Sequence, residues 1–376
     1  MNILLVNMSV DLVLGGGTAE RTCQLVKALQ KLPDTNAKVL STAAGLHAGI
    51  PLDSKQFILL PCLNERWYLP APYVYKTYKS LKWADVVIIT GHWTFINAMV
   101  FFINKIVKRP YVFCPAGAFH KFGRSRIIKR AYNVIVGSSI LQHADRLIAI
   151  PKDEKEYFYK LGIARNKIAV IPNGIKIEDF SYANDDAFKA KYAIGDSPFL
   201  LFMGRLNEIK GPDILLHAFF NIAAQFPSLH LVIAGPDGGM ELQLKQLIKK
   251  QRMTLRVHLI GYISGKDKSE AYHAAELMVV PSRSEAMSIV ALEAAVCGTA
   301  VMLTNQCGFS ELVKAGGAVE VDADVVSMTD TLVTSLKDTG NLKKMGKRGK
   351  EFICNNYTWD IAAKKQRLLC EKLTTI

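Results

Sequence analysis

Short apolar runs alternate with helical patterns along the whole chain. In the first half, the apolar runs that predict buried β-strands are Ile3–Asn7, Lys38–Ser41, Val86–Thr90, Tyr111–Cys114 and Leu147–Ile150. After Gly174 the cycle restarts with the strand patterns "PFLLFMGR", "LHLVIAG", "VHLIGY", "LMVVP" and "AVMLT", which are separated by helical patterns such as "DILLHAFFNIAAQF". Strands rich in branched residues that alternate with helices predict parallel sheets covered by helices on both faces.

The number of predicted strands indicates two domains. A single sheet of ten or more strands is unusual, and 376 residues exceed the usual size of one core. Pro172, Asn173 and Gly174 interrupt the pattern, so we place the domains at residues 1–172 and 173–355. The expected fold class is α/β, with two Rossmann-like, doubly wound parallel-sheet domains that face each other across a cleft. The carboxyl ends of the strands would then bind a ligand in that cleft.

Composition narrows the class of protein. The N-terminal "MNILLVNMS" has no basic stretch and predicts a buried strand in place of a signal peptide. The apolar run Phe95–Val107 is too short to span a bilayer. Seven scattered cysteines without a C-x-x-C pair suggest neither a disulfide framework nor a zinc site, and they fit a reducing cytoplasm.

Positive charge is concentrated in one segment. The chain carries a formal net charge of +14, and eleven Lys or Arg residues stand against one acid between Tyr75 and Arg130. Such a surface favours a nucleic acid, an anionic membrane or a phosphorylated substrate as partner. Charge alone is equally consistent with a solvated basic face that has no partner.

Three loops that follow predicted strands contain glycine. Gly15, Gly16 and Gly17 come after the first strand and open a helix, where free backbone N–H groups can meet an anion. Their spacing is not that of a dinucleotide fingerprint, and a purely structural turn explains them as well. Gly204 ends the strand in "LFMGR", and Gly235 follows "LVIA", where turn chemistry alone accounts for "GPDGG".

The loop after Gly204 also contains Arg205 and Lys210. Two cations at the carboxyl end of a strand suit a diphosphate, because Arg grips phosphate oxygens with a fork and Lys adds a point charge. The alternative is a pair of solvated loop cations. Pro212 is expected to begin the next helix.

Two glutamates eight positions apart flank the start of a largely apolar helix, which we expect to begin near Met287. Eight residues of helix rise about 12 Å, so Glu285 and Glu293 can reach a sugar and a ribose at opposite ends of one nucleotide sugar. The backbone N–H groups of Met287, Ser288 and Ile289 would face phosphate. The alternative, an ordinary surface glutamate, conflicts with the apolar flanks of Glu293, because a buried carboxylate needs a partner.

Two further features leave alternatives open. His92 follows a predicted strand in "GHWTF", where a side chain that faces the ligand belongs, although a lone His beside Trp is often structural. Asp322 and Asp324 form a D-x-D pair that would suit a divalent metal, but helix capping explains both acids.

Together these motifs resemble the retaining glycosyltransferases of family 4, which have the two-Rossmann GT-B architecture. The resemblance covers essentially the whole chain. Its motifs are the Gly-Gly turn, the His after the fourth strand, an "IPNG" hinge, "GR…KG" and E-x7-E, and they are carried here by Gly16-Gly17, His92, Ile171–Gly174, Gly204–Gly211 and Glu285/Glu293. Of these motifs, only E-x7-E is fairly specific to the family by itself. All five in the family's order make the resemblance strong.

The resemblance implies a role for each residue. Arg205 and Lys210 would stabilise the departing diphosphate without a metal or other cofactor, Glu285 would bind the donor sugar, and Glu293 the ribose. His92 would contact the donor sugar and support its transition state. The remaining donor contacts would come from the glycine turn, Gly204, Gly235, the Met287–Ile289 amides, and Ile260 and Tyr262 beside the base. The first domain would bind the acceptor, and a closing helix at about 356–376 would pack back on it.

The chain departs from the family pattern in two places. Ala286-Met287-Ser288 replaces the usual Gly-Phe-Gly after the first glutamate, which indicates a different donor preference. Ala116 stands where relatives often have a basic residue or His, so an acceptor contact there is in doubt.

The acceptor and the cellular location are expectations from the resemblance and the charge. The segment His120–Ser139 forms a basic amphipathic pattern, and similar enzymes dock on the inner membrane leaflet. We therefore expect a UDP- or GDP-sugar donor, an acceptor that is a lipid-linked sugar or a polysaccharide or lipopolysaccharide intermediate, and peripheral attachment to an anionic membrane. Nucleic acid is not expected as a partner.

Other functions of the same fold remain as alternatives. A nucleotide-sugar epimerase would need an acid constellation that the sequence does not show, and a phosphorylase would need a cofactor lysine context. A non-catalytic basic binding protein on a transferase scaffold predicts damage at the donor residues, yet Arg205, Lys210, Glu285 and Glu293 are all present.

Overall fold

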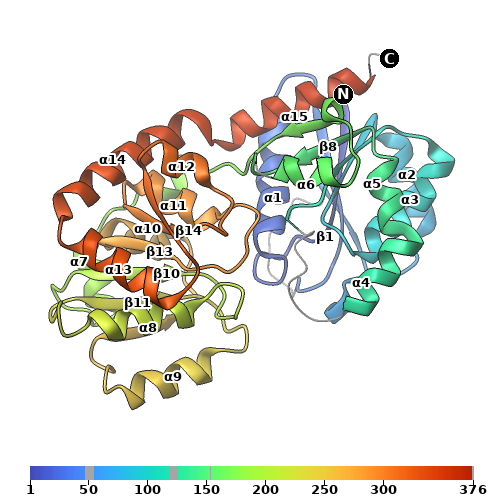
Figure 1. Cartoon of the computed structure of the whole chain (residues 1–376). Helices are drawn as coiled ribbons and strands as arrows, with labels where there is room; N and C mark the ends of the chain where they lie inside the picture. The colour runs from blue at the N-terminus through green and yellow to red at the C-terminus, as the bar shows by residue number, and fades with distance from the viewer. Residues whose placement is uncertain (47–54, 118–125, 153, 375–376) are drawn as a thin grey trace. The chain divides into compact units, whose positions relative to one another are not determined.

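The computed structural model describes residues 1–46, 55–117, 126–152 and 154–374 (Figure 1). The chain divides into two compact units. Unit 1 comprises Met1–Gly174 with Trp359–Ile376, and unit 2 comprises Ile175–Thr358.

Unit 1 is built on a seven-stranded parallel sheet with the order β3-β2-β1-β6-β7-β8-β9. The strands are β1 (Asn2–Ser9), β2 (Asn36–Thr42), β3 (Phe57–Leu60), β6 (Val86–Thr90), β7 (Tyr111–Cys114), β8 (Arg146–Ala149) and β9 (Ile168–Val170). The strand order reverses between β1 and β6, which pair in parallel from Ile3↔Val86 to Val6↔Ile89. In an open α/β sheet, ligands bind beside the carboxyl ends of the strands at such a reversal.

Helices cover this sheet, and one of them comes from the end of the chain. They are α1 (Gly16–Gln30), α2 (Val74–Trp83), α3 (Phe95–Val107), α4 (Arg126–Tyr132), the π-helical turn η2 (Asn133–Gly137), α5 (Ser138–Gln142), α6 (Glu154–Lys160) and α15 (Trp359–Thr374). A hairpin of β4 (Cys62–Asn64) and β5 (Leu69–Pro70) and the 3-10 turns η1 (Glu65–Trp67) and η3 (Arg165–Lys167) complete the unit. Helix α15 packs beside α1 (Figure 1), and Arg367 Nη1 donates to the Pro33 carbonyl at 2.8 Å.

Unit 2 contains a six-stranded sheet with the order β12-β11-β10-β13-β14-β15, in which every pairing is parallel. The strands are β10 (Phe199–Met203), β11 (His230–Ala234), β12 (Val257–Gly261), β13 (Leu277–Val280), β14 (Val301–Thr304) and β15 (Ala318–Val321). The order reverses between β10 and β13, which pair at Leu200↔Leu277. The loops after these two strands therefore lie at the position where a ligand site is expected.

The helices of unit 2 follow the strands in turn. They are η4 (Ile177–Phe180), α7 (Asp185–Lys191), α8 (Pro212–Ile222), α9 (Glu241–Lys250), α10 (Gly265–Ala274), α11 (Ile289–Cys297), α12 (Ser310–Lys314), α13 (Val325–Leu336) and α14 (Thr339–Asn356). Helix α8 packs beside α13, whereas α11 packs against both α10 and α14. The predicted α/β class with two parallel sheets is confirmed.

Candidate active site

The loop between β10 and α8 presents Lys210. The Lys210 backbone N–H donates to Asn207 Oδ1 at 3.0 Å, which holds the loop in a tight turn before α8 begins, as predicted, at Pro212. Gly235 lies against this loop, because a Cβ there would stand 1.8 Å from the Gly204 carbonyl oxygen. Gly235 is therefore needed for close packing of the two strand ends. The Lys210 side chain is about one-third exposed.

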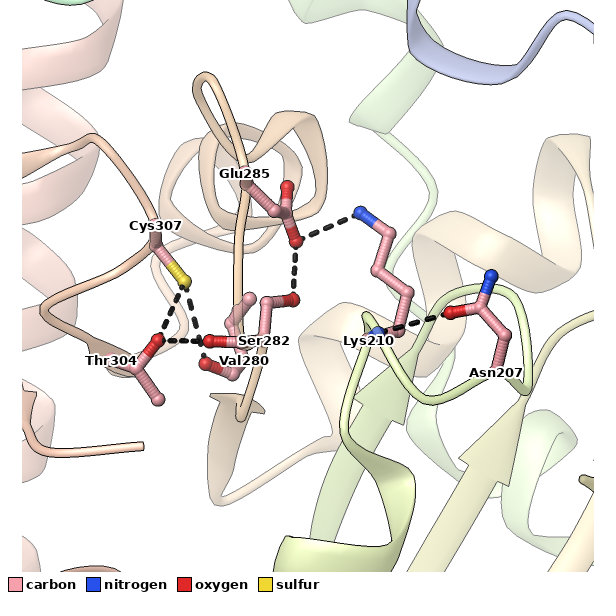
Figure 2. Close-up of polar contacts among 7 residues, drawn as sticks. All are labelled: Asn207, Lys210, Val280, Ser282, Glu285, Thr304 and Cys307. Carbon is pink, nitrogen blue, oxygen red and sulfur yellow. Dashed lines mark hydrogen bonds and ion pairs between the residues drawn. The ribbon is translucent and has the colours of Figure 1, made fainter. Parts of the chain in front are cut away.

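Glu285 meets Lys210 from the loop after β13. The Lys210 Nζ lies 2.8 Å from Glu285 Oε1, and the same oxygen accepts a hydrogen bond from Ser282 Oγ at 2.5 Å (Figure 2). The Glu285 side chain is only 7% exposed, so the ammonium and the hydroxyl compensate much of the loss of water around its carboxylate. Ser282 was not among the predicted site residues, although it stands three residues before Glu285 in the sequence.

Arg283 ties the two loops together. Its Nη1 and Nη2 donate to the Asp213 carboxylate at 2.9 and 2.6 Å, and its backbone N–H donates to the Ile209 carbonyl at 2.8 Å. A bidentate Arg–carboxylate pair is geometrically specific. It therefore fixes the loop that carries Lys210 beside the loop that carries Glu285.

Two buried side chains, Thr304 and Cys307, support the backbone around Ser282. Thr304 Oγ1 donates to the Ser282 carbonyl at 2.5 Å, and Cys307 Sγ lies 3.3 Å from Thr304 Oγ1 and 3.5 Å from the Val280 carbonyl (Figure 2). Burial, reinforced by the Glu285 charge, raises the pKa of the Cys307 thiol to about 12, so this cysteine is a protonated packing group. Nothing in its sequence context distinguished it from the other cysteines.

Glycine is required beside the Glu285 loop as well. Gly308 has φ +61°, and a Cβ there would lie 2.0 Å from the Ala286 carbonyl oxygen. Helix α11 follows, with Ser288 as its N-cap and Ile289 as its first residue, so the expected start near Met287 is two residues early. Met287 and Ser288 are buried, and the N–H groups at this helix start have no acceptor within the helix.

Glu293 is the fifth residue of α11 and is buried, with 5% of its surface exposed. Its Oε1 accepts from Lys268 Nζ at 2.6 Å and its Oε2 from the Tyr272 hydroxyl at 2.6 Å. The expectation that this carboxylate needs a partner is confirmed. Lys268 and Tyr272 themselves were missed, although they are four residues apart on α10 and therefore share one helix face.

Burial and the neighbouring Glu293 charge raise the pKa of Tyr272 well above its ordinary value. Its hydroxyl therefore remains a hydrogen-bond donor at any physiological pH.

The remaining predicted contacts of this unit lie at the same edge of the sheet. Ile260 is half-buried near the end of β12, Tyr262 is exposed just beyond it, and Arg205 is half-buried after β10.

In unit 1 the predicted residues lie at the strand reversal. Gly16 and Gly17 open α1 after β1, as expected, and His92 follows the neighbouring strand β6. His92 is 7% exposed, and its Nε2 lies 2.9 Å from Asn133 Oδ1. Burial lowers the pKa of His92 to about 4, so the imidazole is neutral at neutral pH.

Metal binding finds no support in the D-x-D pair. Asp324 caps α13 by accepting from the backbone N–H of Ser327 at 2.9 Å, and Asp322 accepts from Asn305 Nδ2 at 2.6 Å. Within the described ranges, no three His, Cys, Asp or Glu side chains gather closely enough to hold a metal ion.

Among the helices that the structure describes, none is both long and apolar enough to cross a membrane.

The chain is similar to known proteins over both units. Residues 184–352 match the family model "Glycosyl transferases group 1", and residues 15–179 match "Glycosyltransferase Family 4". A D-inositol 3-phosphate glycosyltransferase of Mycolicibacterium smegmatis is 32% identical over 201 residues, which are 51% of this chain and 45% of the relative. The same enzyme of Nocardia farcinica is 29% identical over 219 residues, 56% and 49% of the two chains. The chain thus spans about half the length of these curated relatives.

Solved structures resemble the whole chain. Anabaena Alr3699/HepE in complex with UDP and glucose superposes with a TM-score of 0.79 at 17% identity, covering 100% of both chains. WaaG, a glycosyltransferase involved in lipopolysaccharide biosynthesis, gives a TM-score of 0.70 at 15% identity and covers 99% of both chains. At these identities the likeness establishes the fold.

Proposed function

Because the chain belongs to the glycosyltransferases of family 4 and has their GT-B fold, we propose that it transfers a sugar from a nucleotide-sugar donor to an acceptor hydroxyl. The transfer retains the anomeric configuration and needs no metal. The observation that carries this proposal is the Lys210–Glu285 pair at the strand reversal of unit 2. It brings a cation for a diphosphate and a carboxylate for sugar hydroxyls to within 2.8 Å of each other.

Each residue then has a chemical task. Lys210 has three N–H donors, so it can bind a phosphate oxygen while one N–H stays bonded to Glu285. The Arg205 guanidinium binds the same diphosphate through two N–H groups. Charge that develops on the leaving diphosphate is stabilised by these fixed cations and by the α11 N-terminus. Glu285 accepts from donor-sugar hydroxyls, Glu293 from ribose hydroxyls, and His92 contacts the donor sugar. The other donor contacts are Gly16, Gly17, Gly204, Gly235, Ile260, Tyr262 and the Met287–Ile289 amides.

Nucleotide binding tests the donor site directly. Calorimetric titration with UDP and GDP is expected to give one binding nucleotide, and Glu293→Ala is expected to abolish or strongly weaken that binding. Glu241→Ala is the matched control, because Glu241 is a partly exposed helical glutamate whose carboxylate pairs with Lys245 of its own helix. If neither nucleotide binds, or if Glu293→Ala binds as the wild type does, the donor proposal is wrong.

Turnover separates the transferase from its alternatives. HepE was solved with UDP-glucose, so UDP-glucose is a reasonable first donor to try. Release of UDP together with a glycosylated product supports transfer. An isomerised sugar still attached to its nucleotide indicates an epimerase instead, and binding without any turnover favours a scaffold.

For the acceptor we propose a lipid-linked sugar or a polysaccharide or lipopolysaccharide intermediate, reached from an anionic membrane on the cytoplasmic side. Support comes from the helical segment that begins with α4. Residues 120–125 of the predicted amphipathic segment lie outside the described residues, but from Arg126 the chain is helical through α4, η2 and α5. Its exposed apolar residues are Ile127 (85%), Ile128 (50%), Val134 (80%) and Ile135 (72%).

These four side chains recur at the spacing of one helix face. Lys129 and Arg130 stand between them, in the segment with eleven cations and one acid. An apolar face flanked by cations fits the interface of an anionic bilayer. Co-sedimentation with phosphatidylglycerol vesicles is therefore expected, with little binding to phosphatidylcholine.

A charge placed on the face tests whether it inserts. Ile135→Asp is expected to release the protein from anionic vesicles. Leu255→Asp is the control, because Leu255 is even more exposed than Ile135 (85% against 72%) but lies in unit 2. Binding that ignores anionic lipid content, or that survives Ile135→Asp, would count against the membrane proposal and leave a water-soluble acceptor.

A further inference from the structure

Asn133 contacts two residues of the loop after β6, His92 and Trp93. Its Oδ1 lies 2.9 Å from His92 Nε2 and 2.8 Å from Trp93 Nε1. An indole N–H can only donate, so the Asn133 atom that faces Trp93 must be the carboxamide oxygen. The Asn133 atom that contacts His92 Nε2 is therefore a hydrogen-bond acceptor. It follows that Nε2 carries the proton and that Nδ1 is the ring nitrogen with the lone pair.

The π-helical turn brings this carboxamide to His92. Helix α4 ends at Tyr132, and η2 inserts its wider turn before α5 resumes the α-helix. A single π turn re-aims side chains and often marks a functional site. Gly137 makes room for it, because a Cβ there would lie 2.7 Å from Asn133 Oδ1 and 3.0 Å from His92 Cε1.

Two further contacts dock the same segment on the loop after β6. The Tyr132 hydroxyl donates to the Thr94 carbonyl at 3.0 Å, and Lys129 Nζ lies 4.4 Å from the centre of the Trp93 ring. Trp93 itself has φ +55°, a left-handed backbone that a tryptophan rarely adopts. Backbone strain of this kind persists where the surroundings enforce it, and here the contacts from Lys129, Tyr132 and Asn133 do so.

We propose that Asn133 is the positioning residue of His92, which it holds with Nε2 protonated and Nδ1 presented as a hydrogen-bond acceptor. A neutral imidazole in this tautomer accepts a hydrogen bond from a hydroxyl of the donor sugar. The inference rests on the proposed function in one respect, namely that His92 contacts the donor. The tautomer itself does not depend on any activity.

The surroundings of the ring agree with a neutral imidazole. Burial lowers the pKa of His92 to about 4, whereas the Asn133 bond acts in the opposite direction and only partly offsets it. From α4 the titratable neighbours are Tyr132, edge-on with 5.7 Å between ring centres, and Lys129 above Trp93. From β7 the phenyl ring of Phe113 packs at 5.7 Å. None of these neighbours carries a negative charge at neutral pH, so none of them stabilises an imidazolium.

Nitrogen NMR of the full chain labelled with ¹⁵N-histidine measures the tautomer without any substrate. The His92 signals are assigned by their loss in His92→Gln. In the wild type we expect the Nε2–H tautomer and no titration of His92 between pH 5.5 and 8. Asn133→Leu removes the acceptor and is expected to give a mixture of tautomers, and Gly137→Ala, which displaces the carboxamide, should do the same.

Asn133→Asp gives a sharper test, because a carboxylate keeps the acceptor but adds a negative charge. The Nε2 proton is expected to remain and the pKa of His92 to rise into the measurable range. Ser138→Ala is the control, because Ser138 lies exposed on the same segment. A wild-type Nδ1–H tautomer, an ordinary His92 titration, or unchanged tautomers in Asn133→Leu and Gly137→Ala would each overturn the inference.

Kinetics then link the tautomer to the reaction, with release of UDP from UDP-glucose as the probe. Asn133→Leu is expected to lower kcat about 10-fold to 100-fold at every pH, with a smaller change in KM. Asn133→Asp should lose activity as pH falls through the new pKa of His92 and regain it at higher pH. The same pH profile in Asn133→Asp as in the wild type would contradict the proposed role. If neither UDP-sugars nor GDP-sugars are turned over while the NMR results hold, the positioning of His92 stands and the proposed function fails.

Discussion

Removal of one hydroxyl tests how the buried Glu293 is held. Tyr272 is fully buried, and its hydroxyl donates to Glu293 Oε2 at 2.6 Å. Tyr272→Phe deletes this donor and leaves the ring, its packing near Phe180 and the hydrogen bond from Thr299 to its backbone carbonyl in place. The carboxylate then keeps Lys268 on one oxygen and loses the donor on the other.

The expected cost follows from the charge of the acceptor. A hydrogen bond to a charged group contributes about 1.5–3 kcal/mol, and the cost is highest where water cannot replace the lost donor. With Glu293 only 5% exposed, we expect Tyr272→Phe to destabilise unit 2 by about 2 kcal/mol. At a urea slope of about 2 kcal/mol per molar, the unfolding midpoint moves down by about 1 M.

Circular dichroism measures the unfolding midpoint, and fluorescence supplies an internal control. All four tryptophans (Trp67, Trp83, Trp93 and Trp359) belong to unit 1, so their emission follows the unit that does not carry the substitution. We expect the dichroism transition of unit 2 to shift, the tryptophan transition to stay, and the affinity for the bound nucleotide to fall about tenfold.

Tyr262→Phe is the matched variant for stability, because Tyr262 is 55% exposed and its loss should leave the midpoint unchanged. Equal midpoints for the wild type and Tyr272→Phe would refute the reasoning. They would mean that the Glu293 carboxylate is not restrained by the Tyr272 hydroxyl, and that Lys268 alone compensates its burial.

Three further predictions concern the same molecule. Lys210→Met should weaken UDP binding about 10-fold to 100-fold in calorimetry, with partial recovery in Lys210→Arg, because the diphosphate loses a charged donor beside Glu285. Gly308→Ala, whose methyl group meets the Ala286 carbonyl, should lower the free energy of unfolding in urea by at least about 1 kcal/mol. The pKa of His92 is lowered on folding from 6.5 to about 4, so its contribution to stability is complete above pH 6.5 and is lost as pH falls towards 4. That loss amounts to about 3 kcal/mol, and unfolding measured from pH 7 to 4 should show it in the wild type but not in His92→Gln.

The sheets could be predicted because their strands are buried on both faces. Runs such as Val86–Ile89 and Phe199–Met203 are continuously apolar in the sequence and continuously buried in the structure. The strands β3 and β9 were missed, since Phe57–Leu60 and Ile168–Val170 are short and no clear helical pattern sets them apart. Patterning identifies a strand only where it is long enough to show a period or a sustained run.

The loops of the candidate site were predictable for a similar reason. Lys210 and Glu285 follow two strands whose ends were clear, and neighbouring parallel strands bring their carboxyl ends to one edge. Their partners were harder to find. Ser282, Lys268 and Tyr272 are ordinary residues in the sequence, and only the packing of α10 against α11 gives the last two their role. A side chain that acts through a tertiary contact leaves no local signal unless its helix face is compared with every other.

Asn133 marks the limit of this kind of prediction. The sequence from Arg126 onward is simply helical, and a π turn adds one residue without changing the apolar pattern by enough to be seen. The inserted turn nevertheless decides which side chain meets His92. Had the helix continued with α geometry, the residues that follow Tyr132 would be rotated relative to the loop after β6 and the carboxamide would point elsewhere.

Glu293, the proposed ribose contact, has a carboxylate that the protein holds in place on both oxygens. An ionised carboxylate offers about four lone-pair sites, and here Lys268 and Tyr272 occupy one on each oxygen. One site on each oxygen remains for the two neighbouring hydroxyls of a ribose, so the protein partners do not compete with the ligand. They fix the plane of the carboxylate before the ligand arrives, and less conformational entropy is then lost on binding. This arrangement predicts that Lys268→Met and Tyr272→Phe weaken nucleotide binding, whereas a competition between Lys268 and the ribose would make Lys268→Met bind more tightly.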